Sequence, residues 1–364
     1  MKKIIPKLFF LIVIVLIMFL CLEIAFRAFK PQVTYDAASD ASPAVFASSD
    51  YLPWQLTPSA TDMQQSPHGE FNVTVHVNDL GLRDNGFSND ASVKRILLFG
   101  ASFTFGHGVE LHETYASVLE QALGKDYDVI NAAYASGYSP DTYALYLQQE
   151  GMAFDPDVVM IGLYVGNDIT DLFKNTYQSP EHITSDFYYI DDDNRLRRSM
   201  YNNEGSFTIF LRTHSHMFVY LKEKFHWMFR THYTKSTIYD VDYDEALQEK
   251  FDQLTTTLID IHTFTAALDI PLVIVLIPTQ LQLDDMQWEA YASHTTPSVE
   301  RLRVQTLLTK LFEEQDISVI DLYDGFHSYD DIDTLYFAKD GHWNPEGHTL
   351  AAEIITEEFL ALHR

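Results

Sequence analysis

From Lys94 to the C-terminus, short continuous runs of apolar residues alternate with stretches in which apolar residues recur every three or four positions. The first pattern is typical of strands buried on both faces, and the second of amphipathic helices. The runs fall at residues 96–99, 129–130, 158–163, 272–277 and 317–322, and the clearest helical stretches at 115–123, 246–258, 302–311 and 350–359. This alternation predicts an α/β fold, a three-layer αβα sandwich with a central parallel sheet, whose ligands bind beyond the carboxyl ends of the strands.

The chain before this alternation is predicted to hold one strand and a tether. Apolar and polar residues alternate from Phe71 to Val75 before a turn at residues 78–81, which indicates an edge strand. Residues 31–70 are rich in Ala, Ser, Pro, Asp and Gln and show little periodicity, which is typical of a tether without a core. We therefore expect the folded domain to span residues 71–364.

The most apolar part of the chain lies within residues 1–30. Three lysines precede an unbroken apolar run from Leu8 to Leu22, and the segment reaches the thickness of a bilayer core only if it is counted from Ile4 to Phe26. Because bulky and charged residues follow the run, we favour an uncleaved transmembrane anchor over a signal peptide. The lysines come first, so the positive-inside rule predicts a single-pass protein of the inner membrane whose main body lies on the periplasmic side.

Residues 170–243 interrupt the strand and helix alternation and are predicted to be an insertion. Within it, residues 206–235 carry five Lys or Arg side chains against Glu223 alone, and aromatic residues lie between them. This pattern predicts a basic aromatic helix. Two interpretations stay open: a helix packed on the domain with a solvated basic side, or a lid or interfacial helix that rests on the membrane.

Composition and charge narrow the classes of function. The chain has 364 residues, 24 Lys and Arg against 52 Asp and Glu, and a formal net charge of −28, so it repels nucleic acids. Cys21 is the single cysteine, which excludes an intramolecular disulfide framework and a cysteine-rich zinc site. The chain lacks the sequence motifs of common metal and nucleotide sites, so we expect no cofactor and no metal. The sequence does not indicate an oligomeric state.

Candidate chemistry gathers where the predicted strands end. Ser102 follows the first buried strand, and a serine hydroxyl needs a base within hydrogen-bond reach to act as a nucleophile. Asp340 and His342, just before the final helix, could supply that base and a carboxylate to orient it. Gly137 and Asn167 follow later strands and could donate hydrogen bonds to the oxyanion of an acyl-transfer intermediate.

Four sequence blocks carry a family resemblance: residues 96–109 (ILLFGASFTFGHGV), 131–137 (NAAYASG), 166–168 (GND) and 340–344 (DGHWN). In order and spacing they resemble the blocks of the SGNH/GDSL hydrolase superfamily. The resemblance covers the chain from Lys94 onward, apart from the insertion, and it implies a flavodoxin-like SGNH hydrolase fold. It also implies Ser102 as nucleophile, His342 as base and Asp340 behind it. The Ser102 N–H, Gly137 and Asn167 would be the oxyanion donors.

Two positions differ from the usual family pattern. Ala101 stands where the first block normally has an aspartate that helps fix the loop around the nucleophile. Asp340 lies two residues before His342 instead of three, a spacing that resembles the branch related to alginate O-acetyltransferases, which move acetyl groups onto exported polysaccharides. Ala101 could therefore mark altered activity or a non-catalytic relative.

The sequence thus predicts a membrane-anchored serine hydrolase that acts on an ester, an O-acyl group of a carbohydrate or lipid. Water as acceptor would make it an esterase, and a sugar hydroxyl would make it an O-acetyltransferase with the same residues. A non-catalytic envelope scaffold or sugar-binding module is the alternative of a different class. The remaining histidines of interest, His107, His214, His216 and His348, are expected to be structural.

Overall fold

The computed structural model describes residues 5–32, 42–66, 69–88, 90–134, 137–172, 188–198, 206–224, 237–295 and 298–362. Its centre is a parallel sheet with the strand order β11-β10-β7-β5-β6. The strands are β5 (Lys94–Gly100), β6 (Tyr127–Asn131), β7 (Val158–Tyr164), β10 (Leu272–Ile277) and β11 (Ser318–Asp321). All the strands predicted from continuous apolar runs are therefore present, and the central parallel sheet is confirmed.

The strand order places a crevice between the first and third strands of the sheet. The chain leaves β5 to form β6 on one side and then returns to form β7 on the other side of β5, the flavodoxin-like order. Gly100 at the end of β5 is in register with Gly162 on β7. In open α/β sheets a ligand binds beyond the carboxyl ends at such a switch point. Ser102 and Asn167 follow these two strands.

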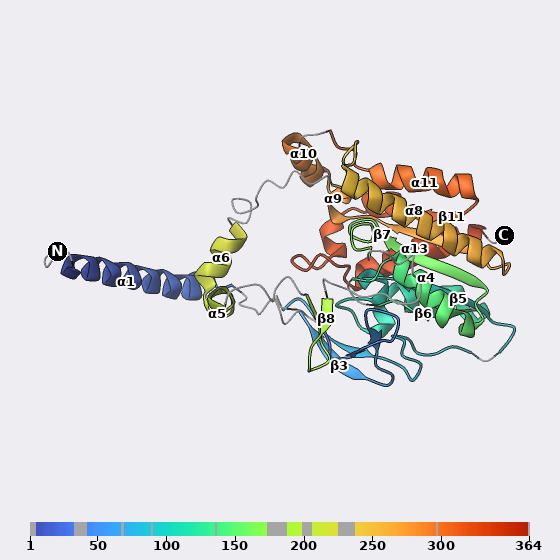
Figure 1. The fold of residues 1–364 in the computed structure, drawn as a ribbon, viewed down its shortest axis with the longest axis horizontal. Helices are drawn as coiled ribbons and strands as arrows, with labels where there is room; N and C mark the ends of the chain where they lie inside the picture. The colour runs from blue at the N-terminus through green and yellow to red at the C-terminus, as the bar shows by residue number, and fades with distance from the viewer. Residues whose placement is uncertain are drawn as a thin grey trace.

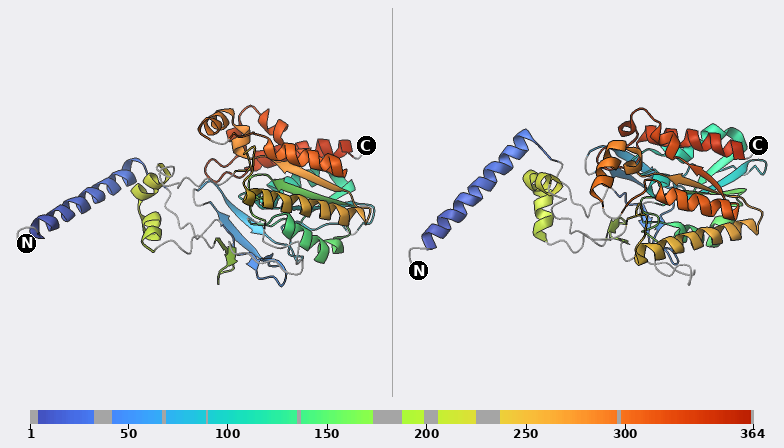
Figure 2. Two further views of the ribbon diagram at one scale, coloured as in Figure 1. Left: turned by 45° about the horizontal axis from the view of Figure 1, so that its top comes forward. Right: turned by 90° about the horizontal axis from the view of Figure 1, so that it is seen from above.

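Helices cover both faces of the sheet (Figures 1 and 2). One face carries α4 (Pro140–Gln149), α8 (Glu245–Ala266) and α11 (Arg303–Gln315), and the other carries α3 (Tyr115–Leu123), α12 (Tyr323–His327) and α13 (Pro345–Leu362). Shorter helices are α2 (Ser102–Phe105), α9 (Gln280–Leu283) and α10 (Asp285–His294), and 3₁₀ turns span Leu111–Glu113, Gly124–Asp126, Gly151–Phe154 and Ile332–Leu335. The strands are apolar on both sides because each side meets a helical layer.

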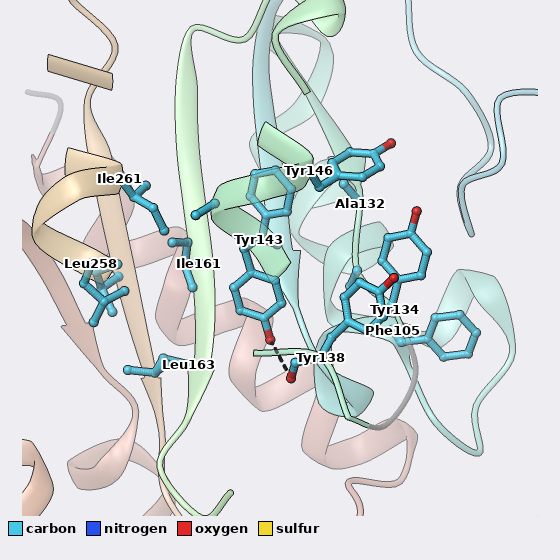
Figure 3. Packing of buried hydrophobic residues seen from close by; sticks show 14 of the residues in the cluster. Phe105, Ala132, Tyr134, Tyr138, Tyr143, Tyr146, Ile161, Leu163, Leu258 and Ile261 are labelled. Carbon is cyan, nitrogen blue, oxygen red and sulfur yellow. Dashed lines mark hydrogen bonds between the residues drawn. The ribbon is translucent and has the colours of Figure 1, made fainter. Parts of the chain in front are cut away.

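Figure 3 shows the packing between β7 and the helices on one face. Ile161 and Leu163 of β7 point toward Leu258 and Ile261 of α8, and these side chains are almost fully buried. Complete burial of such a side chain contributes about 1.5–3 kcal/mol. On the other side of the strand, the Tyr143 hydroxyl donates to a backbone carbonyl 3.3 Å away, so this buried phenol is satisfied.

The expectation that residues 31–70 form a tether without a core is wrong for residues 42–66. This stretch holds β1 (Phe46–Ala47), β2 (Gln55–Leu56) and β3 (Thr61–Gln65), and Phe46 and Trp54 are fully buried in the main core. The sequence hides this because the buried residues follow no regular period. The predicted strand after Phe71 exists as β4 (Asn72–His76), but it pairs antiparallel with β3 in a separate hairpin and not with the central sheet.

The described parts of the predicted insertion contain no strand of the parallel sheet. They hold the hairpin β8 (Tyr188–Ile190) and β9 (Leu196–Arg198), followed by α5 (Ser206–His214) and α6 (His216–Lys224). The basic aromatic helix predicted over 206–235 is thus two helices as far as residue 224, and residues 225–236 lie outside the described part. The break falls at Ser215.

The N-terminal segment forms α1 (Ile5–Phe29), and α6 lies beside its C-terminal part (Figure 1). Glu23 of α1 accepts hydrogen bonds from the Ser215 hydroxyl and from the backbone N–H groups of His216 and Met217. Among the described residues, no helix combines the length and the apolarity that a membrane crossing requires. The predicted transmembrane helix over Ile4–Phe26 is therefore not supported; the unbroken apolar run between its charged residues is shorter than the ~20 residues of a full span.

Candidate active site

Ser102 lies on a tight turn from β5 into α2. Phe105 N–H donates to Ala101 C=O, and Thr104 packs back against the end of β5. A Cβ at Gly100 would lie 1.9 Å from Thr104 Oγ1, so this approach requires glycine. The local sequence therefore positions Ser102 at the carboxyl edge of the sheet, as the pattern predicts. The Ser102 N–H, at the first residue of α2, has no intrahelical acceptor and can donate elsewhere.

The structure brings Ser102, His342 and Asp340 into one hydrogen-bonded chain. Ser102 Oγ lies 2.8 Å from His342 Nε2, and His342 Nδ1 lies 2.6 Å from Asp340 Oδ1. Because Nδ1 faces a carboxylate, it carries the imidazole proton, and Nε2 is left to accept from the serine hydroxyl. This is the arrangement that a serine nucleophile, its general base and an orienting carboxylate require.

Asp340 is ionised in this environment. Burial by itself would raise the pKa of the carboxyl, but hydrogen bonds from His107 and His342 and the charge of both rings outweigh burial and hold the pKa well below its usual range. The loop around Asp340 is also fixed by Glu70, whose carboxylate accepts the N–H groups of Lys339 and Asp340 at 2.9 and 3.0 Å. The carboxylate therefore stays charged and oriented across the neutral pH range.

The two predicted oxyanion donors are placed differently. Asn167 lies beyond the end of β7, shares a pocket with Ser102, and donates from Nδ2 to Asp171 Oδ2 at 2.7 Å, which fixes its amide. Gly137 is buried with φ of +91°, a backbone conformation that favours glycine, but it is not among the lining residues of the pocket. It directly follows residues 135–136, which lie outside the described part.

A pocket of about 670 Å³ opens over this chain of residues. Ser102, His342 and Asp340 form one side, and the other walls come from β7, from residues 237–239 and from the start of α9. Its lining consists of Ser102, Phe103, Tyr164, Gly166, Asn167, Thr170, Thr237, Ile238, Tyr239, Leu247, Thr279, Gln280, Leu281, Asp340, Gly341 and His342. The size suits a small acyl group with part of the molecule that carries it.

Sequence analysis missed Arg83, which fixes the loop after the nucleophile. Its side chain is completely buried and donates to three backbone carbonyls, those of Phe105, Gly106 and Val109, at 2.5 to 2.7 Å. Burial lowers the pKa of the guanidinium to about 10, so it remains charged at neutral pH. A lone arginine before the first block has no motif that marks it; only its burial reveals the role.

His107 is the second residue that sequence analysis missed, because it was expected to be purely structural. Its Nε2 lies 3.5 Å from Asp340 Oδ2, and its ring centroid is 4.3 Å from that of His342. Among the described residues, His107, Asp340 and His342 have ligand atoms within 4.8 Å of one another, close enough to hold a metal ion. The atom pair Asp340 Oδ1 and His342 Nδ1 is already hydrogen-bonded, so we describe these residues as a hydrogen-bonded cluster.

The other histidines make local contacts away from the reacting atoms. His348 is buried and accepts the Tyr115 N–H at Nδ1, and burial, with the nearby charges of Arg83 and His342, lowers its pKa to about 3. His216 accepts the Gln32 N–H, and His214 stacks on Phe210. These contacts agree with the structural roles expected for His214, His216 and His348.

The C-terminal part of the chain matches a family model. The model is described as an SGNH hydrolase-like domain, acetyltransferase AlgX, and it covers residues 223–363, which include Asp340 and His342 but not Ser102. A search of curated proteins finds no match. The matched segment supplies the proposed base and its carboxylate together with β10 and β11 of the sheet.

Several solved structures are distantly similar. A lipase/acylhydrolase from Enterococcus faecalis is 14% identical with a TM-score of 0.40, over 74% of this chain and 97% of that one. A psychrotrophic esterase from Pseudoalteromonas is 11% identical with a TM-score of 0.40, over 74% of this chain and 98% of its own. A lipolytic protein of the G-D-S-L family from Veillonella parvula is 16% identical with a TM-score of 0.38, over 74% and 99%. Nothing about activity follows from likenesses this distant.

The family match and the residue blocks agree with the geometry of the site. The Asp-x-His pair lies in the matched segment, and the Ser102 turn and Asn167 face it across the carboxyl edge of a sheet with the flavodoxin-like order. Over residues 223–363 the chain is therefore similar to the SGNH hydrolase-like domain of this family.

Proposed function

We propose that this protein cleaves an ester bond through an acyl-serine intermediate, with Ser102 as nucleophile, His342 as base and Asp340 as the orienting carboxylate. The observation that carries the proposal is the hydrogen-bonded chain from Ser102 Oγ through His342 to Asp340, on the wall of a pocket. A capping serine or a packed histidine would not need this geometry. The substrate class is an ester-bearing carbohydrate or lipid, and the bond is that of an O-acyl group.

The reaction runs in two half-reactions. Ser102 Oγ attacks the acyl carbonyl while His342 Nε2 takes its proton, and the negative charge on the carbonyl oxygen is stabilised by the Ser102 N–H and the Asn167 amide. Gly137 is the proposed third donor. The intermediate collapses, the alcohol leaves with the proton from His342, and the acyl group stays on Ser102. An acceptor hydroxyl then attacks the acyl carbon while His342 takes its proton. The bond from the acyl carbon to Ser102 Oγ breaks, the acyl group leaves on the acceptor, and His342 returns the proton to Oγ.

The acceptor decides between two activities that need the same residues. Water gives an esterase, whereas a sugar hydroxyl gives an O-acetyltransferase. The description of the matched family and the Asp-x-His spacing favour the transferase as the second candidate.

Charge supports an uncharged substrate. The chain carries a formal charge of −28, and the described lining of the pocket contains no lysine or arginine. A polyanionic chain would be repelled on approach and would find no cation among these residues. Hydroxyl and amide groups of Thr237, Thr279 and Gln280 line the pocket together with Tyr164 and Tyr239, a mixture suited to a neutral sugar.

The test is turnover of p-nitrophenyl acetate by the full chain, with and without a neutral or an anionic polysaccharide acceptor. Ser102→Ala should abolish turnover and labelling by a fluorophosphonate probe, and Ser92→Ala, on an exposed loop, is the matched control. Acetyl found on the acceptor would identify the transferase. A folded wild-type protein that neither turns over the ester nor takes the probe would refute the proposal and favour the non-catalytic scaffold.

We further propose that the domain lies outside the cytoplasm, on the periplasmic side of an inner membrane. The support is the order of charges in the sequence: Lys2, Lys3 and Lys7 precede the apolar run, as in a segment that directs export. Protease added to spheroplasts should digest the domain while a cytoplasmic control protein survives. Protection of the domain until the cells are lysed would contradict this location.

A further inference from the structure

The carboxylate behind the proposed base has two histidine neighbours. Asp340 Oδ1 lies 2.6 Å from His342 Nδ1, and Asp340 Oδ2 lies 3.5 Å from His107 Nε2. The two imidazole rings are 4.3 Å apart and inclined by 31°, so both rings face the same carboxylate. His107 and Asp340 are largely buried, with 12% and 15% of their side chains exposed. Little water is available to replace either contact.

Gln64 of β3 determines which nitrogen of His107 carries the proton. The Gly108 N–H needs an acceptor, and it finds Gln64 Oε1 at 2.9 Å. The side-chain NH₂ of Gln64 therefore points the other way, toward His107 Nδ1 at 3.0 Å, and Gln64 is only 1% exposed. An NH₂ group can only donate, so His107 Nδ1 accepts and the proton of the neutral ring lies on Nε2, which faces Asp340.

We propose that His107 is a positioning residue, held as the Nε2–H tautomer by Gln64, that fixes Asp340 and thereby His342 for the reaction at Ser102. The inference rests on the proposed function and deepens it. The relay runs from Gln64 through His107, Asp340 and His342 to the serine. The Asp340 carboxylate faces both rings, so it cannot rotate away from His342 without losing a contact.

Removal of the His107 N–H has two consequences. The carboxylate loses one of its donors and is free to rotate, so fewer molecules hold His342 in the reactive orientation. Its negative charge then acts on His342 alone, which stabilises the imidazolium and moves the acid limb of the pH–rate profile to higher pH. Other titratable groups lie near the cluster: Glu70 accepts the Asp340 N–H, Tyr164 lines the same pocket, and the charges of Arg83 and His342 act on His348. These groups are unchanged in every variant compared, so they do not contribute to a difference between the pH profiles.

The experiment compares His107→Leu with His107→Gln in the full chain. Leucine keeps most of the volume and removes the donor, whereas the glutamine amide can place an N–H near the position of Nε2. We expect His107→Leu to lower kcat by roughly ten- to a hundredfold, less than the ~10⁴-fold that a misoriented triad histidine costs. KM should change little, and the acid limb should move up by roughly half to one pH unit. His107→Gln should recover most of kcat.

His112→Leu, at an exposed position in the 3₁₀ turn Leu111–Glu113, is the matched control. Full activity and an unchanged pH profile in a folded His107→Leu protein would overturn the inference. So would a His107→Gln protein as impaired as His107→Leu, because a hydrogen bond would then not be the cause. Loss of wild-type turnover in EDTA would also overturn it and would indicate that the cluster holds a metal ion.

A second readout does not depend on activity. Long-range ¹H–¹⁵N spectra of histidine-labelled full-length protein distinguish Nε2–H from Nδ1–H rings, and the resonances lost in His107→Gln identify His107. The inference requires the Nε2–H tautomer at neutral pH, and the Nδ1–H tautomer would refute it. If the wild type turns over no ester, the proposed function is refuted. If the wild type is active and His107→Leu has the same kcat and pH profile, only the role of His107 is refuted.

Discussion

The sharpest test of how the nucleophile loop is held is the substitution Arg83→Met. It keeps an unbranched chain of similar length but removes the donors to the carbonyls of Phe105, Gly106 and Val109. A buried carbonyl left without a donor costs about 1–3 kcal/mol, or roughly 2–6 kcal/mol for those of Phe105 and Val109. The Gly106 carbonyl still accepts the Val109 N–H at 3.4 Å. The substitution also removes the cost of burying a charged guanidinium, and this gain offsets several kcal/mol of the loss. We therefore expect a net loss of about 1–3 kcal/mol in the free energy of unfolding.

The effect on activity should exceed the effect on stability. The loop from Phe105 to Val109 contains Gly106 and His107, whose N–H groups both donate to the carbonyl of Ser102 at 3.0 Å. Loss of Arg83 therefore loosens the backbone of the nucleophile and the position of His107 together. Urea unfolding gives the stability, and ester turnover at a temperature where the variant is folded gives kcat. Arg83→Lys, which keeps the charge but not the planar fork, should be intermediate.

Arg95→Met is the matched control. Arg95 also donates to two backbone carbonyls, those of Phe154 and Ser88, but it lies near the start of β5, at the opposite end of the strand from Ser102. Its loss should lower the free energy of unfolding by about 1–2 kcal/mol and leave kcat unchanged. Arg83→Met with near-wild-type stability and turnover would refute the role assigned to Arg83, as would an equal fall of kcat in both variants.

Three further predictions concern the site and the core behind it. Asn167→Ala should lower kcat about a hundred- to a thousandfold in a folded protein, and full turnover would remove Asn167 from the oxyanion site. Gly100→Ala should destabilise the fold by about 1–3 kcal/mol and abolish fluorophosphonate labelling, because its Cβ would lie 1.9 Å from Thr104 Oγ1; normal melting and labelling would contradict this packing. Burial lowers the pKa of His348 to about 3, so below pH 6.5 the unfolded chain takes up a proton that the folded protein does not. As the pH falls below 6.5, the free energy of unfolding of the wild type should therefore decrease by roughly 1.4 kcal/mol per pH unit relative to that of His348→Gln. The same pH dependence of both proteins in urea unfolding would contradict this cause.

The sheet and the reacting residues could be predicted because each depends on local sequence. A strand buried on both faces must be continuously apolar, as Val158 to Leu163 are, and the chain must turn directly after it. Residues that follow such strands reach the same edge whatever the loops between them do. Ser102 was therefore predictable from its position, whereas Asp340 and His342, just before α13, were predicted from their chemistry and from the resemblance of the sequence blocks.

The supporting contacts could not be predicted, because they depend on how distant segments pack. Glu70 accepts the N–H of Asp340, a residue 270 positions away, and nothing in the spacing of either residue indicates the contact. Residues 42–66 were expected to lack a core because Phe46 and Trp54 follow no regular period, yet both are fully buried. Irregular segments that are ordered by contact with a finished domain have no periodic pattern to detect.

Three residues of the segment before the sheet hold the loops around Ser102 and Asp340. Ala101 is buried and makes no side-chain hydrogen bond, so it does not fix the loop of Ser102 through a polar contact. Arg83 holds the carbonyls of the same loop, Gln64 holds Gly108 and His107, and Glu70 holds the loop of Asp340. These three residues reach the nucleophile side and the base side of the pocket from one stretch of chain, residues 64–83. The alignment of Ser102 with His342 therefore depends on that stretch, which holds both loops although Ala101 contributes no polar contact.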